Sequence, residues 1–200
     1  VNKKHFKMPS ELTVFDPFCG TGVIPIEAML REWHVLASDK ELKAVNGCTK
    51  NVEWVRKTYK VPKKKLDVTV WKHDATKPFE LKEPPHMIVT EGSLGPNMKS
   101  RPMLKDIERL SKNAEELTEK FLANCAESLP GVPVVMTWPV WYSSKRPVML
   151  TKALKVCEKL GYKPVLPPHT IGGTRSTLLY RRTDQFVGRE LVLLEPVAKA

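Results

Sequence analysis

TVFDPFCGTGVIPIEAML, residues 13–30, places an apolar run directly before an acid, a pair of glycines and a helical pattern. Gly20 and Gly22 are separated by a single residue, and a turn of this kind lets the backbone come close to a ligand at the start of the next helix. The stretch therefore predicts a strand, a ligand-binding turn and a helix. A GxG turn alone is equally typical of a domain that binds a nicotinamide dinucleotide.

Strand-like and helix-like patterns alternate along the rest of the chain, which predicts a mostly parallel sheet with helices on both faces. The expected strands are residues 12–15, 34–38, 67–71, 87–90 and 132–137, and the expected helices are 23–32, 41–59, 103–128 and 147–160. Two later runs, 177–181 and 190–195, predict a β-hairpin that closes the sheet with an antiparallel edge.

Length and cysteine usage limit the class of protein. The 200 residues are expected to form one domain, 1–200, and we interpret residues 1–11 as the end of a missing N-terminal segment. No apolar run approaches the roughly 18 residues that a membrane span needs, and the four cysteines form no CxxC pair. We therefore expect a cytoplasmic protein with no metal site, no disulfide framework and no membrane partner.

The charge balance points to a polyanionic partner. Lys and Arg total 33 against 22 Asp and Glu, which gives a net charge of +11. Cations that neutralise phosphates release condensed counterions and so favour binding. Nucleic acid is the predicted partner, and the alternative is a basic enzyme whose lysines are merely solvated.

An acid follows each of the first three expected strands. Asp16 ends the first and would favour a positive charge, and Asp39 ends the second, where a carboxylate can accept both hydroxyls of a ribose. Asp74 follows the third, where it can reach an adenine amino group. Together the three acids predict a site for a nucleoside with a cationic end. The alternatives are that Asp39 is the N-cap of the next helix and that Asp74 caps a turn.

The motif DPFCGTG, followed by SDK and HDAT, resembles the class I S-adenosylmethionine-dependent methyltransferases. Within them the chain is most similar to the tRNA guanosine N2-methyltransferases that carry an upstream THUMP domain, and to their DNA-methylase-like relatives. The resemblance covers residues 13 to about 195. It implies a Rossmann-like, doubly wound α/β fold with a mostly parallel seven-stranded sheet whose last strand is antiparallel.

The resemblance also implies S-adenosyl-L-methionine as cofactor and assigns the residues around it. Asp16, Gly20 and Gly22 would border the methionine part, Asp39 the ribose and Asp74 the adenine. The neighbouring positions that complete the implied cofactor site are Pro17, Phe18, Cys19, Thr21, Lys40 and Ala75. Cys19 is interpreted as a small packing residue without chemistry of its own.

The fourth expected strand departs from the family pattern. Enzymes of this kind that methylate an exocyclic amine usually carry Asp/Asn-Pro-Pro-aromatic here, with the acid or amide accepting a hydrogen bond from the amine and the ring stacking on the base. This chain has IVTEGSLGPN, residues 88–97, with Glu91 at the acidic position. Ser93 stands in place of a proline and Leu94 in place of the aromatic ring. Glu91, Ser93 and Leu94 are the candidate catalytic positions, with stacking to be supplied by another ring.

Aromatic and basic residues after the fifth expected strand offer such a ring platform. The stretch TWPVWYSSKRP contains Trp138, Trp141 and Tyr142 beside Lys145 and Arg146, a combination suited to a flipped or single-stranded base. The alternative is that the rings pack beneath a loop. Two later segments, IGGTRS with Arg175 and YRRTDQFVGR (residues 180–189), either bind a backbone phosphate or form tight turns with exposed arginines.

These observations predict a methyltransferase that acts on RNA, at a base exocyclic amine in tRNA of the guanosine N2 type. A separate upstream segment or partner protein would supply RNA affinity. The alternatives are a DNA methyltransferase and a module that binds cofactor or RNA without turnover, because the fourth-strand motif is EGSLG.

Overall fold

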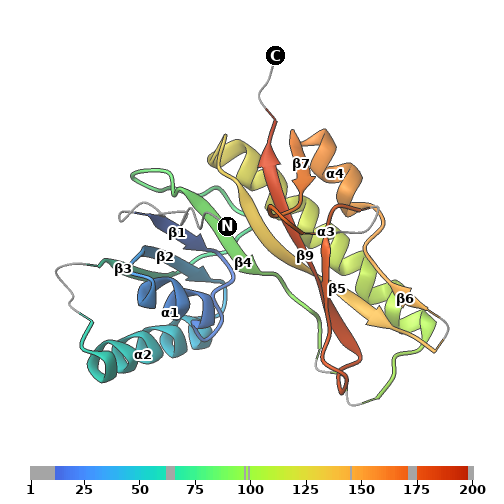
Figure 1. Ribbon diagram of the computed structural model, residues 1–200, viewed down its shortest axis with the longest axis horizontal. Helices are drawn as coiled ribbons and strands as arrows, with labels where there is room; N and C mark the ends of the chain where they lie inside the picture. The colour runs from blue at the N-terminus through green and yellow to red at the C-terminus, as the bar shows by residue number, and fades with distance from the viewer. Residues whose placement is uncertain are drawn as a thin grey trace.

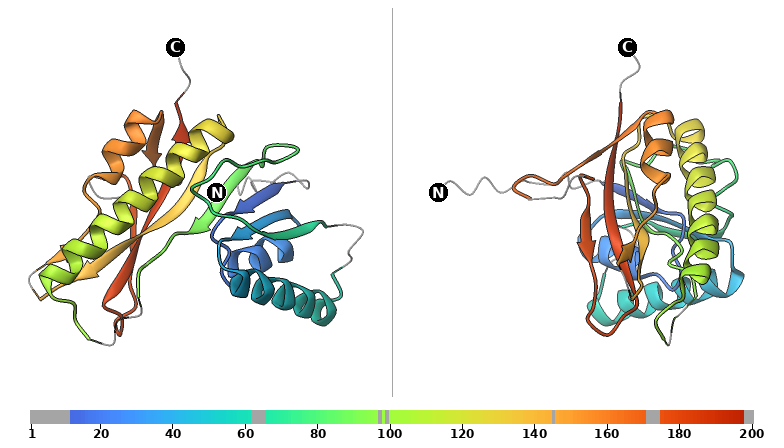
Figure 2. Two further views of the ribbon diagram at one scale, coloured as in Figure 1. Left: turned by 180° about the vertical axis from the view of Figure 1, so that it is seen from behind. Right: turned by 90° about the vertical axis from the view of Figure 1, so that its right-hand side faces the viewer.

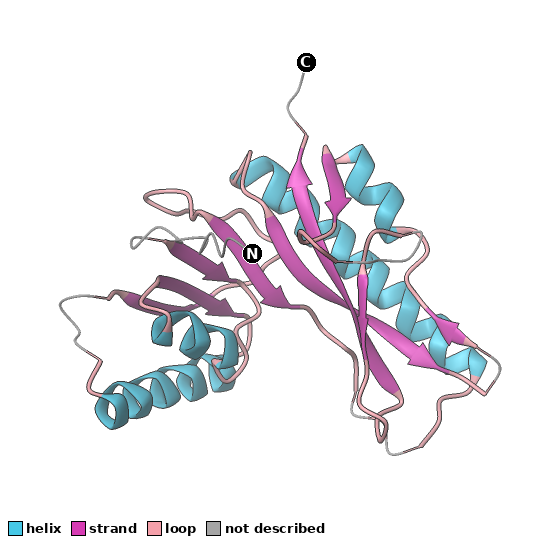
Figure 3. Cartoon of the chain, in the orientation of Figure 1, coloured by secondary structure: helices cyan, strands magenta, loops and turns pink. Residues whose placement is uncertain are grey.

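The computed structural model describes residues 12–61, 66–96, 98, 100–144, 146–170 and 175–197. Figures 1 and 3 show how its elements are arranged. In chain order they are β1 (Thr13–Asp16), α1 (Val23–Leu30), β2 (His34–Asp39), α2 (Leu42–Tyr59), β3 (Val68–Lys72), β4 (Met87–Glu91), α3 (Leu104–Ser128), β5 (Val134–Tyr142), β6 (Pro147–Val148), α4 (Ala153–Lys159), β7 (Tyr162–Val165), β8 (Leu178–Tyr180) and β9 (Val187–Pro196).

The strands form one sheet in the order β3-β2-β1-β4-β5-β9-β7. The first five strands in this order are parallel, and β9 is antiparallel to both of its neighbours. Two short strands outside this order, β6 and β8, bring the sheet to nine strands within the described residues. The predicted Rossmann-like α/β class is confirmed, and its seven-stranded order forms the body of the sheet.

Helices cover both faces of the sheet, as Figure 2 shows from two sides. On one face α1 and α2 enclose a core that includes Val14, Val35 and Val52. On the other face α3 and α4 enclose a larger core that includes Phe121 and Cys157. The central strands are apolar on both sides for this reason, as expected for a parallel sheet.

The sequence predicted that the hairpin forms the edge of the sheet, and this prediction is wrong. Its second strand, β9, lies between β5 and β7, with Val134 opposite Leu194 and Trp141 opposite Val187. Leu194 is also paired with Pro164 of β7. Every second residue of β9 from Gly188 to Leu194 is buried, on one face of the sheet, and β9 pairs with β5 along one edge and with β7 along the other, so it is internal.

The predicted helix 147–160 is wrong in its first part. Pro147 and Val148 pair with the end of β5 as a short antiparallel strand, and α4 begins only at Ala153. Glu115 of α3 accepts hydrogen bonds from the backbone N–H groups of Thr151, at 2.8 Å, and Lys152, at 2.9 Å. A tertiary contact therefore sets where this helix begins.

A buried ion pair holds the hairpin to the segment before α4. Glu190 of β9 is fully buried and accepts hydrogen bonds from Arg175 Nε at 2.7 Å and from the Thr177 hydroxyl at 2.7 Å. Arg175 Nη2 also donates to the carbonyl of Leu150 at 2.6 Å.

Within the described ranges, none of the helices combines the length and apolar character that crossing a bilayer requires.

Arg175→Ala is expected to destabilise the fold by about 3 kcal/mol, because it leaves the buried Glu190 carboxylate without its counter-charge. The matched control is Lys163→Ala, which removes an exposed pair with Glu195 at 3.9 Å on the same strand and should cost less than about 1 kcal/mol. Urea denaturation of both variants measures the difference. Equal losses would show that burial of Glu190 does not govern the pair.

Candidate functional site

The two glycines of the first turn serve different purposes. Gly20 has φ +51°, and a Cβ built on it would meet no described atom within 4 Å, so the backbone is open on that side. Gly22 is the N-cap of α1 with φ +95°, and its Cβ would lie 2.8 Å from Cys48 Sγ. Gly20 therefore permits approach of a ligand, whereas Gly22 permits close packing of the turn on α2.

Backbone hydrogen bonds hold the turn against β2 and α2. The Cys19 N–H donates to the carbonyl of Ser38 at 2.9 Å, and the Gly20 N–H donates to Asp39 Oδ2 at 3.0 Å. From α2, Asn51 Nδ2 donates to the carbonyl of Thr21 at 2.8 Å. The turn is therefore fixed before any ligand binds.

Asp16 is buried at the end of β1, with 1% of its surface exposed. Its Oδ1 accepts hydrogen bonds from the Thr90 hydroxyl at 2.6 Å and from the Phe18 N–H at 3.2 Å. Burial raises the pKa of Asp16 from 3.8 to about 7, although both hydrogen bonds oppose the change. Thr90, on the neighbouring strand β4, is a site residue that sequence reasoning missed.

A cavity of about 780 Å³ opens where the carboxyl ends of β1 and β4 separate. This is the point at which the strand order reverses, where open α/β sheets bind their ligands. The cavity continues from the glycine turn past the end of β4 to the hairpin. Its lining comprises Asp16, Phe18, Cys19, Gly20, Thr21, Val23, Ile24, Val89, Thr90, Glu91, Gly92, Leu94, Val135, Met136, Thr137, Tyr180, Arg182, Arg189 and Leu191.

The predicted cofactor residues divide into those that line this cavity and those beside it. Asp16, Phe18, Cys19, Gly20 and Thr21 belong to the lining. Its described residues do not include Pro17, Gly22, Asp39, Lys40, Asp74 or Ala75. The assignment of individual residues to parts of the cofactor stays a prediction.

Asp39 and Asp74 lie at the strand ends where the sequence placed them. Asp39 Oδ1 accepts the Glu41 N–H at 2.9 Å, but the N-cap of α2 is Glu41 and not Asp39, and the side chain of Glu41 makes no capping hydrogen bond. Asp74 Oδ1 accepts the N–H of Thr76 at 2.9 Å and its hydroxyl at 2.8 Å, and these bonds lower the pKa of Asp74. The alternative in which Asp74 caps a turn is thus confirmed, and the ionised carboxylate is available to a donor.

Cys19 has no nucleophilic role in this geometry. Its thiol interacts with Cys48 of α2, and this contact together with burial raises the pKa of Cys19 well above its ordinary value. A thiol that does not ionise is a packing group. Within the described ranges, no group of three or more His, Cys, Asp or Glu side chains is placed to hold a metal ion.

The fourth-strand motif brings Glu91 to the cavity, paired with an arginine from the hairpin. Arg189 Nε of β9 donates to Glu91 Oε1 in a charge-assisted hydrogen bond. Gly92 follows with its Cα close to β5, since a Cβ there would lie 3.3 Å from the Thr137 carbonyl. Leu94 lines the cavity, whereas Ser93 lies in a separate, smaller one.

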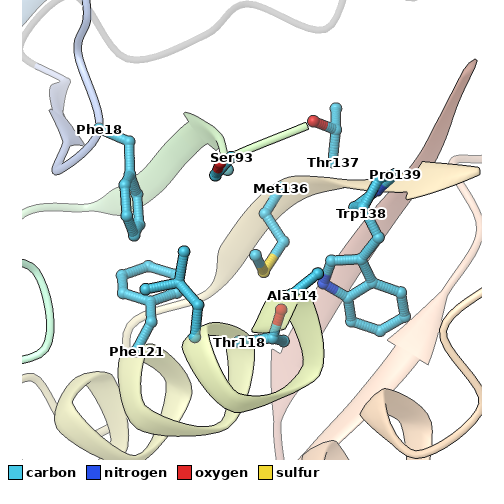
Figure 4. A pocket seen from close by; sticks show the side chains of 11 residues that line it. Phe18, Ser93, Ala114, Thr118, Phe121, Met136, Thr137, Trp138 and Pro139 are labelled. Carbon is cyan, nitrogen blue, oxygen red and sulfur yellow. The ribbon is translucent and has the colours of Figure 1, made fainter. Parts of the chain in front are cut away.

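The predicted aromatic platform is wrong for Trp138 and Trp141. Strand β5 continues to Tyr142, so both indoles point into the core, with 0% and 1% of their surface exposed. Figure 4 shows Trp138 and Phe121 on opposite sides of Met136, and all three line a cavity of about 10 Å³ that cannot hold a base. Neither ring can stack on a substrate.

The remaining predicted substrate residues also lie away from the described cavity lining. Arg181 covers the ring of Tyr142, with its guanidinium carbon 4.0 Å from the centroid. Arg175 is committed to Glu190, so its assignment to substrate is wrong. Arg146 is exposed in the turn before β6, where its N–H and carbonyl bond to the hydroxyl of Ser143. Lys145 and residues 171–174 lie outside the described residues.

The hairpin supplies aromatic and basic residues to the cavity in place of the predicted ones. Tyr180, Arg182 and Arg189 line the cavity opposite the glycine turn. Tyr180 is 49% exposed and is therefore accessible to a stacking partner. The only sequence signal for this group was the segment 180–189, which leaves open which of its arginines face a ligand.

Gly22→Ala is expected to lose about 2–4 kcal/mol of stability, because a left-handed φ and a clash with Cys48 act together. Gly20→Ala, with a left-handed φ but open space, should lose about 1 kcal/mol and bind S-adenosylhomocysteine more weakly. Urea denaturation and calorimetry measure the two effects. A Gly20→Ala variant with native cofactor affinity would contradict the ligand-facing role of that position.

Asp16 is expected to reduce the stability of the fold as the pH rises from about 4 to about 7. A folded-state pKa near 7 against 3.8 for an unfolded chain means that the folded chain holds the proton more tightly, and this advantage is lost on ionisation. Asp16→Asn should therefore gain about 2–3 kcal/mol over the native chain between pH 5 and pH 8, measured by urea denaturation.

The same Asp16→Asn variant should bind S-adenosylmethionine less tightly than the native chain at pH 8, since it has no charge to offer a cation. The exposed Asp67 provides the control, and Asp67→Asn should change neither property. Stability curves for Asp16→Asn and the native chain that run parallel from pH 5 to pH 8 would contradict the assignment.

Several observations fit S-adenosylmethionine to this site. The open side of Gly20 leaves room for a ligand at the turn, and the buried acid Asp16 suits its positive charge. The cavity volume lies within the range of about 300–1,000 Å³ that small ligands occupy. The residues present are therefore suited to this cofactor.

Comparison with solved structures agrees with this fold. NSun6 from Pyrococcus horikoshii, solved with SFG, has a TM-score of 0.64 at 17% identity, covering 94% of this chain and 48% of its own. TrmN from Thermus thermophilus has a TM-score of 0.55 at 15% identity, covering 93% of this chain and 44% of its own. The chain thus spans less than half the length of either protein. Sp1610 from Streptococcus pneumoniae, assigned to tRNA (m1A22) methylation, has a TM-score of 0.54 at 12% identity, covering 94% and 65%.

Sequence comparison identifies the family. No curated protein sequence matches the chain. A family model described as an RMKL-like methyltransferase domain matches residues 7–128, more than half of the chain. With the strand order, the glycine turn and the cavity beside it, this match identifies the chain as a member of the RMKL-like methyltransferase domain family, an S-adenosylmethionine-dependent methyltransferase.

Proposed function

We propose that this domain transfers the methyl group of S-adenosylmethionine to RNA, at a base exocyclic amine in tRNA of the guanosine N2 type. The observation that carries the proposal is a single cavity that contains both the glycine turn and the Glu91 carboxylate. A cofactor at the turn and an acceptor base at Glu91 would share this space. Their reacting atoms could then meet with little further movement.

The charge of the chain supports a nucleic acid substrate. The net charge is +11, and two arginines, Arg182 and Arg189, lie on the substrate side of the cavity. The resemblance of DPFCGTG and its following acids to tRNA methyltransferases supports RNA over DNA. Sp1610 is assigned to tRNA methylation, but at 12% identity its likeness to this chain concerns the fold alone.

Two residues of the chain would hold the acceptor base. Glu91 would accept a hydrogen bond from the amine N–H and stabilise the positive charge that forms on nitrogen. Tyr180 would supply the stacking surface that Leu94 cannot, since it is the exposed ring of the hairpin that borders the cavity. The proton lost from nitrogen would pass to Glu91 or to solvent.

On the other side of the cavity, the chain's residues would orient the cofactor. The bound cofactor supplies an electrophilic methyl group on a sulfonium centre. Asp16 would counter the positive charge from its buried position, and the fixed turn at Gly20 would hold the backbone against the ligand. The chain contributes alignment and electrostatics, which suffice when nucleophile and electrophile are already matched.

A cofactor-binding module without turnover is the second candidate, and one observation favours it. Glu91 Oε1 is engaged by Arg189, which reduces the capacity of the carboxylate to accept the amine. The chain spans 44% of TrmN, and we propose that an upstream domain or partner protein supplies further RNA affinity.

The four described cysteines are free thiols, in keeping with the proposed cytoplasmic location.

The proposal is tested by methyl transfer from tritiated S-adenosylmethionine to unfractionated tRNA and to DNA, followed by mass analysis of the nucleosides. Transfer to tRNA is expected, with Glu91→Gln lowering kcat about 100-fold. Tyr180→Ala should lower kcat/KM at least tenfold, whereas substitution of Tyr59, another exposed tyrosine at the end of α2, by Ala should not.

The other outcomes each identify a different function. Transfer to DNA alone would assign a DNA methyltransferase. Tight binding of S-adenosylhomocysteine with no transfer to any nucleic acid would assign the module without turnover. Undiminished transfer by Glu91→Ala would remove that residue from the mechanism.

A further inference from the structure

The described arginines of the hairpin region separate into two that are structural and two that face the cavity. Arg175 is bonded to the buried Glu190, and Arg181 lies over Tyr142 and donates to the Gln185 carbonyl at 3.0 Å. These two cations hold the hairpin in place. Each of them has a partner within the fold.

Arg182 and Arg189 instead line the cavity. Arg182 is exposed beside Tyr180, whose side chain interacts with its guanidinium. Arg189 pairs with Glu91 through Nε alone, and its Nη1 and Nη2 atoms have no hydrogen-bond partner among the described residues. The fork of donors on Arg189 is thus only partly used.

Within the lining of this cavity the charges on this side do not balance, and Asp184, which also acts on Arg182, lies outside that lining. Two guanidinium groups face one carboxylate, Glu91, because Asp16 is buried on the cofactor side and bonded to Thr90. An anion with several acceptor oxygens would complement the surplus, and a planar guanidinium matches a phosphate through two parallel hydrogen bonds. Tyr180 lies in the same lining and would hold the base of the same nucleotide.

The pair between Glu91 and Arg189 is suited to exchange. Its side chains are 43% and 25% exposed, respectively. An ion pair that water reaches contributes little to stability, so an incoming phosphate can replace the carboxylate at small cost. Glu91 would then be released next to the acceptor base.

We propose that Arg182 and Arg189 form a phosphate subsite for the target nucleotide of RNA, and that phosphate binding frees Glu91 from Arg189 to accept the amine. This inference rests on the proposed function, because it assigns the substrate side of the same cavity. It also accounts for the pairing of Glu91 Oε1 with Arg189 in the free protein. Substrate binding and exposure of the acceptor become one event.

The subsite is tested by binding of a fluorescent single-stranded RNA of mixed sequence to the chain with S-adenosylhomocysteine present, over a series of salt concentrations. Arg182→Ala and Arg189→Ala should each weaken binding about tenfold at low salt. Each should also reduce the slope of log affinity against log salt by about 0.7. Arg109→Ala, which removes an exposed arginine from α3, is the control and should keep the native slope.

The exchange is tested by a double-mutant cycle. Glu91→Gln removes the competitor for Arg189 and should strengthen RNA binding about threefold or more, whereas in the Arg189→Ala background it should have almost no effect. Weaker or unchanged binding by Glu91→Gln would overturn the exchange. Native salt slopes for both arginine variants, or no RNA binding by the native chain, would overturn the subsite.

These measurements do not depend on methyl transfer, so they separate the two proposals. Reduced slopes without transfer to tRNA would leave the phosphate subsite standing and overturn the proposed function. Transfer that is unaffected by Arg182→Ala and Arg189→Ala would leave the function standing and overturn the subsite. Arg182 is fully on the surface, so its variant decides the question even if Arg189→Ala fails to fold.

Discussion

The hydroxyl of Thr90 donates a hydrogen bond of 2.6 Å to the buried carboxyl of Asp16, and this bond joins the ends of β4 and β1 where the strand order reverses. The two strands separate immediately beyond it, and the cavity opens there. Burying the Asp16 carboxyl without a hydrogen-bond partner would cost folding free energy, and the Thr90 hydroxyl supplies that partner. The next residue of β4 is Glu91, so adjacent positions on one strand lie on the proposed cofactor side and the proposed substrate side of the cavity.

The glycine turn depends on the same strand ends. Its backbone is tied to Ser38 and Asp39 of β2, and α2 reaches it through Asn51. Gly22 must lack a side chain because Cys48 of α2 fills the space. The glycine-turn side of the cavity, where we propose that the cofactor binds, is thus held mainly by contacts among β1, α1, β2 and α2, which are neighbours in sequence.

The hairpin side of the cavity has a different origin. Arg189 meets Glu91 across 98 residues of sequence, because β9 is inserted between β5 and β7 and runs along β5. The buried pair of Arg175 with Glu190 holds the neighbouring position of that strand. Arg189, which we propose binds substrate, and Arg175, which stabilises the fold, therefore pair with Glu91 and with the buried Glu190, respectively, and what surrounds each cation distinguishes them.

The sequence by itself determined the α/β class, the strand and helix around residues 13–30, and acids at the ends of the first three strands, because these follow from local patterns of apolar residues, glycines and carboxylates. Only the tertiary structure decided that Trp138 lies in the core and that Tyr180 borders the cavity. Aromatic rings after a strand look alike whether the strand ends or continues. Their exposure depends on which distant strand pairs there, and pairing between β5 and β9 is a long-range contact that no local pattern encodes.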